Sequence, residues 1–182
     1  PPPPPPPPTF FFTQQPPSEM LRSLVGSEMC IRDSFMIGPE RWDASLMYEG
    51  VFPKPVQHHN MTHNQKKEDV AKELQKIDIF HLEQLSYVIS RMKEIKESDG
   101  TSLFENSILT YGAGLGAGAT HQYFDLPMIV AGKGQGQIKQ GRFIRCKSGT
   151  LNSNLWLTLA NLMGLEIDSF ADSSAVISDL WT

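Results

Sequence analysis

Three histidines about a third of the way along the chain have the types and spacing to bind a transition metal. His59 and His63 are spaced i, i+4, so both rings lie on one face if a helix begins there. Neutral imidazoles at this spacing suit zinc or a similar divalent ion, and His58 lies beside them. The alternative is a surface turn in which Thr62 or Asn64 caps the next helix. Both interpretations stay open at this point.

A further histidine, His121, lies in a glycine-rich stretch between two short apolar runs. The runs, 108–111 and 128–130, end at glycines and predict strands buried in a parallel-type sheet. In such sheets, ligands bind in the loops at the carboxyl ends of the strands. The loop that carries His121 and Asp125 is therefore a second candidate site.

The glycines of this loop fit part of a dinucleotide-binding pattern. Residues 112–117 read GxGxxA directly after the first apolar run. A dinucleotide fold also needs a helix that opens there and an acidic residue about 20 positions further on, and the sequence offers neither. We infer instead that the glycines let the backbone turn sharply and approach a ligand or another segment closely.

Residues 66–97 have the period of one long amphipathic helix that ends near Gly100. The sequence also predicts opposite charges paired on its solvent face, Glu73 with Lys76 and Lys93 with Glu97. His81 is the one polar member of the apolar stripe. It is either a core histidine bonded to a backbone carbonyl or part of the same pocket as the earlier histidines. We expect the helix to pack on the two apolar runs through Val70, Leu74, Leu85, Val88 and Met92.

The C-terminal third of the sequence predicts three more elements. Residues 137–145 are typical of a polar, exposed strand, and residues 151–163 have the period of a second amphipathic helix. Gly164 is placed to end that helix. Residues 165–182 are expected to form a packed tail without chemistry of their own.

Composition indicates one soluble globular domain. The chain has 182 residues, 40% of them hydrophobic, and a net charge of −4. No apolar run approaches the roughly 18 residues of a membrane span, so we expect no transmembrane segment. The mild acidity and the mixing of lysines with acids argue against a nucleic-acid partner. The two cysteines, Cys30 and Cys146, form no disulfide framework.

Residues 1–34 differ in character from the rest of the chain. A run of eight prolines opens them, and residues 24–34, LVGSEMCIRDS, resemble a translated sequencing adapter. We expect residues 1–34 to be an adapter-derived, low-complexity artefact that is disordered and packs no core. Residues 35–182 would then be the native part, a C-terminal fragment whose own N-terminus is missing.

Most of the native part resembles a family of exported bacterial proteins. The matching stretches are HNMTHN at 59–64, KIDIFHLEQLSYVISRMK, LTYGAGLG followed by His121, DLPMIVAG, SNLWLTLANLMG and DSFADSS. Together and in this order they resemble the C-terminal half of a domain of unknown function that is named for an HxxSHH motif. Thr62 replaces the serine of that motif and Asn64 replaces its last histidine.

The resemblance implies a fold and a site. The family is distantly similar to the alkaline-phosphatase and sulfatase superfamily, so we expect an α/β fold, the incomplete C-terminal part of an alkaline-phosphatase-like sheet flanked by helices. His121 would correspond to a metal ligand and join His59 and His63, with His58, His81 and Asp125 in the surrounding shell. The nucleophile would lie upstream. A twin-arginine export signal in family members implies the periplasm or cell envelope.

Two functions remain open from the sequence. The first is a hydrolase that uses zinc or a similar divalent metal to cleave a phosphate or sulfate ester, in a small molecule or a polymer. The second is a non-catalytic binding or structural protein of the cell envelope on the same fold. Clustered histidines favour the first. Asn64, and Gly112 where related proteins have an acidic residue, favour the second.

Overall fold

The computed structural model describes Tyr48 and residues 50–181. The predicted artefact at residues 1–34 lies outside the described residues. The chain divides into two compact units, Pro1–Gln84 and Leu85–Thr182. The boundary between the units falls within helix α3, so this helix contributes residues to both.

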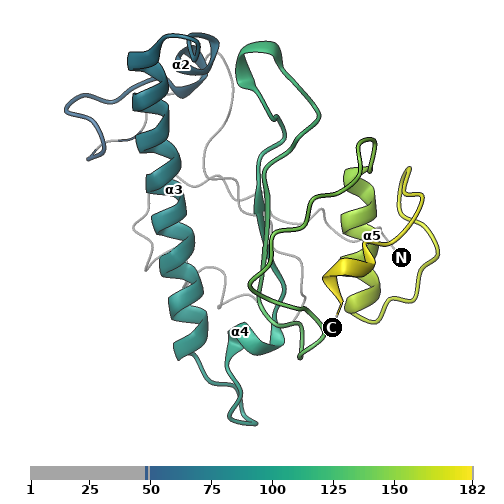
Figure 1. The fold of residues 1–182 in the computed structure, drawn as a ribbon. Coiled ribbons are helices and arrows are strands. Elements are labelled where there is room, and N and C mark those ends of the chain that lie inside the picture. Colours follow the sequence, from purple (N-terminus) through teal and green to yellow (C-terminus); the bar gives the residue numbers. More distant parts are fainter. Residues whose placement is uncertain (1–47, 49, 182) are drawn as a thin grey trace, which may run out of the picture. The chain divides into compact units, whose positions relative to one another are not determined.

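Helix α3, Glu68–Glu94, confirms the long helix that the apolar period predicted (Figure 1). It begins two residues later and ends three residues earlier than expected. The predicted ion pair of Glu73 and Lys76 is present, with 2.8 Å between Lys76 Nζ and Glu73 Oε1. Lys93 Nζ instead lies over the Phe104 ring, and the Glu97 carboxylate accepts a hydrogen bond from the Asn106 amide. Gly100 does not end the helix. Its N–H bonds to the carbonyl of Glu97 at 3.0 Å, in a turn closed by a bridge between Lys96 and Ser102.

The first unit holds helix α2, His58–His63, and the N-terminal part of α3. Among the residues of this unit that the structure describes, the buried hydrophobic ones are Tyr48, with 7% of its surface exposed, and Ile77, with none exposed. The Tyr48 ring lies edge-on to Phe80 at a centroid distance of 6.2 Å. Aromatic contact thus joins the residues before α2 to the middle turns of α3.

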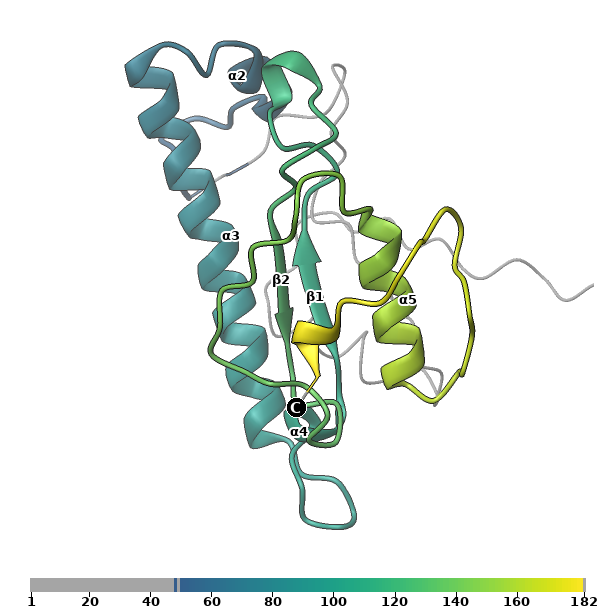
Figure 2. The same ribbon diagram turned by 45° about the vertical axis from the view of Figure 1, so that its right-hand side comes forward.

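The second unit is organised around a two-stranded sheet. Strand β1, Leu109–Gly112, and strand β2, Met128–Ala131, pair antiparallel, with Leu109 opposite Ala131 and Gly112 opposite Met128 (Figure 2). The apolar runs are therefore strands, as predicted, but the parallel-type pairing was wrong. The loop between them holds only a three-residue helix at 118–120 and returns the chain antiparallel, whereas parallel strands are usually joined by a crossover α-helix.

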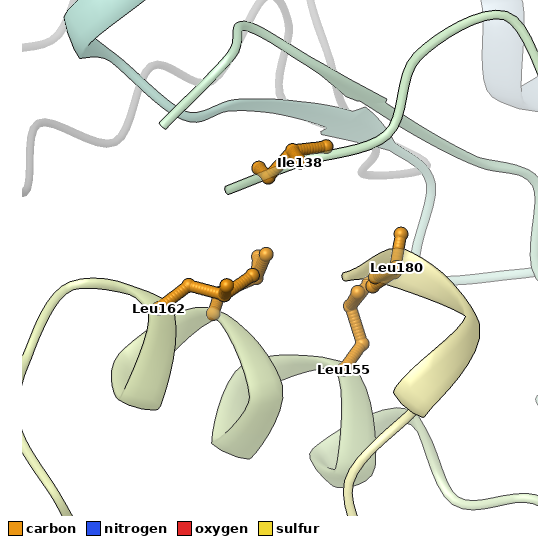
Figure 3. Packing of buried hydrophobic residues seen from close by; sticks show 5 residues of the cluster. Ile138, Leu155, Leu162 and Leu180 are labelled. Carbon is orange, nitrogen blue, oxygen red and sulfur yellow. The ribbon is translucent and has the colours of Figure 1, made fainter. Parts of the chain in front are cut away.

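The first hydrophobic cluster of this unit joins helix α5, Asn152–Leu162, to the chain on either side of it. Leu155 and Leu162 of α5 point toward Ile138 and toward Leu180 of the short helix η2, Ser178–Leu180 (Figure 3). Met128 and Val130 of β2 pack against the same cluster. α5 therefore covers one face of the sheet.

The second cluster lies on the opposite face. Its buried members are Met92 near the end of α3, Phe104 and Ala131 of β2. Phe104 belongs to helix α4, which spans Leu103–Asn106. Leu109 of β1 packs against it. Because successive side chains of a strand point to opposite faces, Val130 and Ala131 serve different clusters. The predicted packing of the long helix on the strands is confirmed at this end.

The remaining predictions for this unit had mixed outcomes. Residues 137–145 do not form the predicted strand. Their pairing is limited to one isolated β-bridge, between Ile138 and Trp181. Gly164, at a φ of 80°, follows the last turn of α5 as predicted. Leu165 N–H bonds to Ala160 O and Gly164 N–H to Asn161 O, which completes a Schellman cap. Within the described part of the chain, every helix is too short or too polar to cross a bilayer.

Candidate functional site

Helix α2 places the two spaced histidines side by side. The Nε2 atoms of His59 and His63 are 3.0 Å apart, and their ring centroids are 4.7 Å apart. This confirms the shared helix face that the i, i+4 spacing predicted. An ion at the ordinary zinc–nitrogen distance of about 2.0–2.1 Å from both atoms would see them at an angle of about 95°. The contact is a hydrogen bond between the two imidazoles, and the same separation would let both nitrogens reach one ion.

The polar side chains around the pair bond back into α2. The Thr62 hydroxyl donates to the His59 carbonyl at 2.7 Å. The Asn64 amide donates to the Asn60 carbonyl at 3.0 Å. Both bonds therefore tie the end of α2 together, whereas the alternative interpretation assigned these side chains to the start of the next helix. The bond from Thr62 also fixes the turn that carries His59.

The rings of His58 and His81 both contact one buried tyrosine, Tyr48. The Tyr48 ring is 5.9 Å from the His58 ring and 5.5 Å from the His81 ring, between centroids. Phe80 adds a further ring at 5.9 Å from His81. Both histidines are half-buried in this aromatic group. His58 and His81 therefore both contact Tyr48, and a pocket shared by His81 with His59 and His63 stays a prediction.

His121 and Asp125 lie in the second unit, on the loop between β1 and β2. His121 ends the short helix η1, Gly118–Thr120, and both residues are exposed with positive φ angles of 50° and 53°. Few residues other than glycine adopt this left-handed backbone. The role of His121 as a metal ligand and that of Asp125 as a carboxylate that orients an imidazole stay predictions.

Glycines shape that loop by close approach, as the sequence predicted. Gly116 N–H bonds to the Gln122 carbonyl at 2.8 Å. A Cβ on Gly116 would lie 2.2 Å from the Phe124 carbonyl oxygen, and one on Gly112 would lie 2.3 Å from Met128 Sδ. Contacts this short are not tolerated, so both positions require glycine while the neighbouring chain stays where it is.

The described residues hold a histidine pair and not a larger ligand set. Among them, no three side chains of His, Cys, Asp or Glu are grouped so that they could hold a metal ion. Asn64, which replaces the last histidine of the family motif, bonds within α2 as described above. Two imidazoles are fewer than the three protein ligands that catalytic zinc sites usually have. His121 as the third ligand remains a prediction.

Sequence reasoning missed a carboxylate network at the start of α4. Glu105 accepts hydrogen bonds from the Ser102 backbone N–H at 2.9 Å and from its hydroxyl at 2.8 Å, and Lys133 Nζ lies 3.1 Å away. These donors, led by the Ser102 N–H, lower the pKa of Glu105 to about 2. The sequence signal was the Ser-x-x-Glu capping box at 102–105. Its role is to cap a helix.

Comparisons with known proteins found no relative from which a function could be inferred. No protein-family model, no curated protein and no solved structure matches this chain. The resemblance to the HxxSHH family therefore continues as a prediction that rests on the motifs quoted above.

Proposed function

We propose that this protein is a metal-dependent hydrolase of phosphate or sulfate esters, related to the HxxSHH family and to the alkaline-phosphatase-like enzymes. One observation carries the proposal, the 3.0 Å separation of the His59 and His63 Nε2 atoms on α2. Chelation by two imidazoles on one helical face is a common start of a zinc site. The family resemblance extends the proposal to a periplasmic or cell-envelope location.

The chain's own residues would act by holding and orienting. His59 and His63 would supply two nitrogen ligands, and the Thr62 hydroxyl steadies the turn between them through its bond to the His59 carbonyl. His121 is the proposed third ligand, and Asp125 is proposed to orient an imidazole through its carboxylate. When bound, a divalent ion polarises an ester oxygen and offsets the charge that develops on it.

Metal content and hydrolysis test this proposal separately. The full-length chain is loaded with zinc or cobalt, freed of excess metal and analysed, beside His63→Ala, His121→Ala and Asn60→Ala. Asn60→Ala is the matched control, because Asn60 is an exposed residue of α2 and brings no imidazole. We expect stoichiometric metal in the wild type and control and its loss in His63→Ala. Hydrolysis of an aryl phosphate and an aryl sulfate is then measured on the metal-loaded protein extended by the native sequence upstream of residue 35, where the family resemblance places the nucleophile.

Metal that survives His63→Ala would remove the histidine pair from the site. Loss of metal in His63→Ala but not in His121→Ala would keep the pair and reject His121. A hydrolase also requires ester cleavage that depends on the bound metal. Stoichiometric metal without turnover would reject the enzyme and leave a metal-binding protein.

The second candidate function is a non-catalytic binding or structural protein of the cell envelope. The observation that favours it is at Gly112, the strand end where related proteins carry an acidic residue. A Cβ at this position would lie 2.3 Å from Met128 Sδ and 2.7 Å from the Pro127 carbonyl oxygen. The space for a carboxylate side chain is therefore filled. Metal binding without turnover is the outcome this candidate predicts.

A further inference from the structure

The segment after β2 concentrates positive charge in a chain that is acidic overall. Between Asp125 and Glu166 the sequence has five basic residues and no acidic one, whereas the whole chain has a net charge of −4. Four of the five fall within nine positions and are exposed: Lys139, Arg142, Arg145 and Lys147. The charge is therefore local, and it belongs to one irregular stretch that leads from the sheet to α5.

The core of the second unit holds this stretch at several points. Ile138 is buried in the cluster of Figure 3 and bridges to Trp181. The Lys139 N–H bonds to the Leu180 carbonyl at 3.2 Å, and the Arg142 guanidinium donates to the Asp179 carbonyl. Ile144 packs against the same cluster. The stretch therefore presents its exposed side chains from an anchored backbone.

Phe143 stands out among these exposed side chains. It is 84% exposed, more than any other large hydrophobic residue that the structure describes. The Arg145 guanidinium lies over its ring, 6.0 Å from the centroid, and Arg142 adjoins it in sequence. An uncovered aromatic ring flanked by cations matches the pattern of membrane-interface anchors, in which the ring enters the headgroup region.

We propose that residues 139–147, the basic segment, dock on the surface of an anionic phospholipid bilayer. The four cations are drawn to the negative headgroups, and Phe143 enters the interface beside them. A nucleic acid fits less well, because a single exposed ring offers no stacking platform and the acidic remainder repels an extended polyanion. This proposal does not depend on the histidine pair.

Vesicle binding by the full-length chain tests the proposal. The vesicles contain either equal parts of phosphatidylglycerol and phosphatidylcholine or phosphatidylcholine alone, and bound protein is separated by flotation. We expect binding to the anionic vesicles only, with weakening as salt is raised, because salt screens exposed charges. Cys146 is exposed within the segment, so after Cys30→Ser it takes an environment-sensitive dye, whose emission should shift to the blue on binding.

Charge and ring are tested by separate variants. Arg145→Glu with Lys147→Glu should weaken binding at least about twentyfold, since each basic residue near an anionic surface contributes about fivefold. Phe143→Ser should weaken it about tenfold without changing its salt dependence. The matched control is Lys54→Glu with Lys66→Glu, which makes the same charge change at exposed lysines of the first unit. It should alter binding less than about twofold.

Three results would overturn the proposal. The first is no binding to the anionic vesicles, including the case in which a single-stranded oligonucleotide binds instead. The second is equal weakening by the control pair, because the attraction would then be a property of the net charge. The third is binding that is unchanged by Phe143→Ser and leaves the Cys146 dye unshifted, because the segment would then not touch the bilayer.

Discussion

The hydroxyl of Thr158, in the middle of α5, accepts a hydrogen bond from the backbone N–H of Ile177 at 2.7 Å. The same hydroxyl donates to the Asn154 carbonyl at 2.6 Å, and Thr158 is completely buried. One turn away, the Asn154 side-chain oxygen accepts from the Ser174 N–H at 2.8 Å. Two side chains of α5 therefore satisfy the backbone of the C-terminal tail.

Replacement of Thr158 by valine should release part of this tail. The change keeps the shape but removes the acceptor of the N–H of Ile177, a half-buried residue, which costs up to about 1–3 kcal/mol. Urea unfolding of the full-length chain measures the loss. Hydrogen exchange at the Ile177 amide should accelerate in Thr158→Val and not in Thr150→Val, which alters an exposed threonine. An unchanged exchange rate would contradict the assigned bond.

Met92 should matter more to stability than Leu85. The sequence predicted that both face the strands, but Leu85 is only half-buried, whereas Met92 is 8% exposed and packs with Phe104 and Ala131. Met92→Ala should cost about 2–5 kcal/mol, the range for truncation of a buried side chain of this size. Leu85→Ala should cost clearly less. The free energies of unfolding of the two variants test this prediction. A larger loss in Leu85→Ala than in Met92→Ala would mean that α3 turns a different face toward the strands.

Two glycines of the β1–β2 loop should respond to alanine in opposite directions. An alanine Cβ at Gly116 would lie 2.2 Å from the Phe124 carbonyl oxygen, whereas at Gly114 it would meet nothing within 4 Å. Gly116→Ala should destabilise the chain by more than about 1 kcal/mol, because backbone must move. Gly114→Ala should be neutral or stabilising by up to about 1 kcal/mol. Equal effects in thermal unfolding would contradict the loop geometry.

Glu105 should make stability depend on acid pH. Its pKa is about 2 in the folded chain, below its ordinary value of 4.5, so the folded state favours the ionised form. This contribution is fully present above about pH 4.5 and is lost as the pH falls toward about 2. The pKa of Asp99 is also lowered, by the hydrogen bonds from Thr101, and adds in the same sense.

Urea unfolding at a series of pH values measures this dependence. Glu105→Gln removes the titrating group, so its free energy of unfolding should vary less with pH than that of the wild type across this window. Glu166→Gln, at an exposed carboxylate, should keep the wild-type slope. If the free energy of unfolding of Glu105→Gln varies with pH as steeply as that of the wild type, the acid sensitivity comes from other carboxylates.

Local pattern alone predicted the two longer helices, α3 and α5, and the two strands. A stripe with the helical period specified α3, and short apolar runs that end at glycines specified β1 and β2, because these signals depend on neighbours within a few residues. The shared face of His59 and His63 was equally readable, since i, i+4 spacing fixes it once a helix forms. The Ser102–Glu105 capping box was readable too and was missed.

Long-range contacts decided the rest. The sequence pattern was the same for a parallel or an antiparallel pair, and the direct hairpin between β1 and β2 decided the direction. Ile138 was expected in an exposed strand and is 4% exposed, because α5 and Leu180, distant in sequence, cover it. Which partner packs on a side chain depends on chain segments far from it, so periodicity alone could not show that Ile138 is buried or that Thr158 anchors the tail.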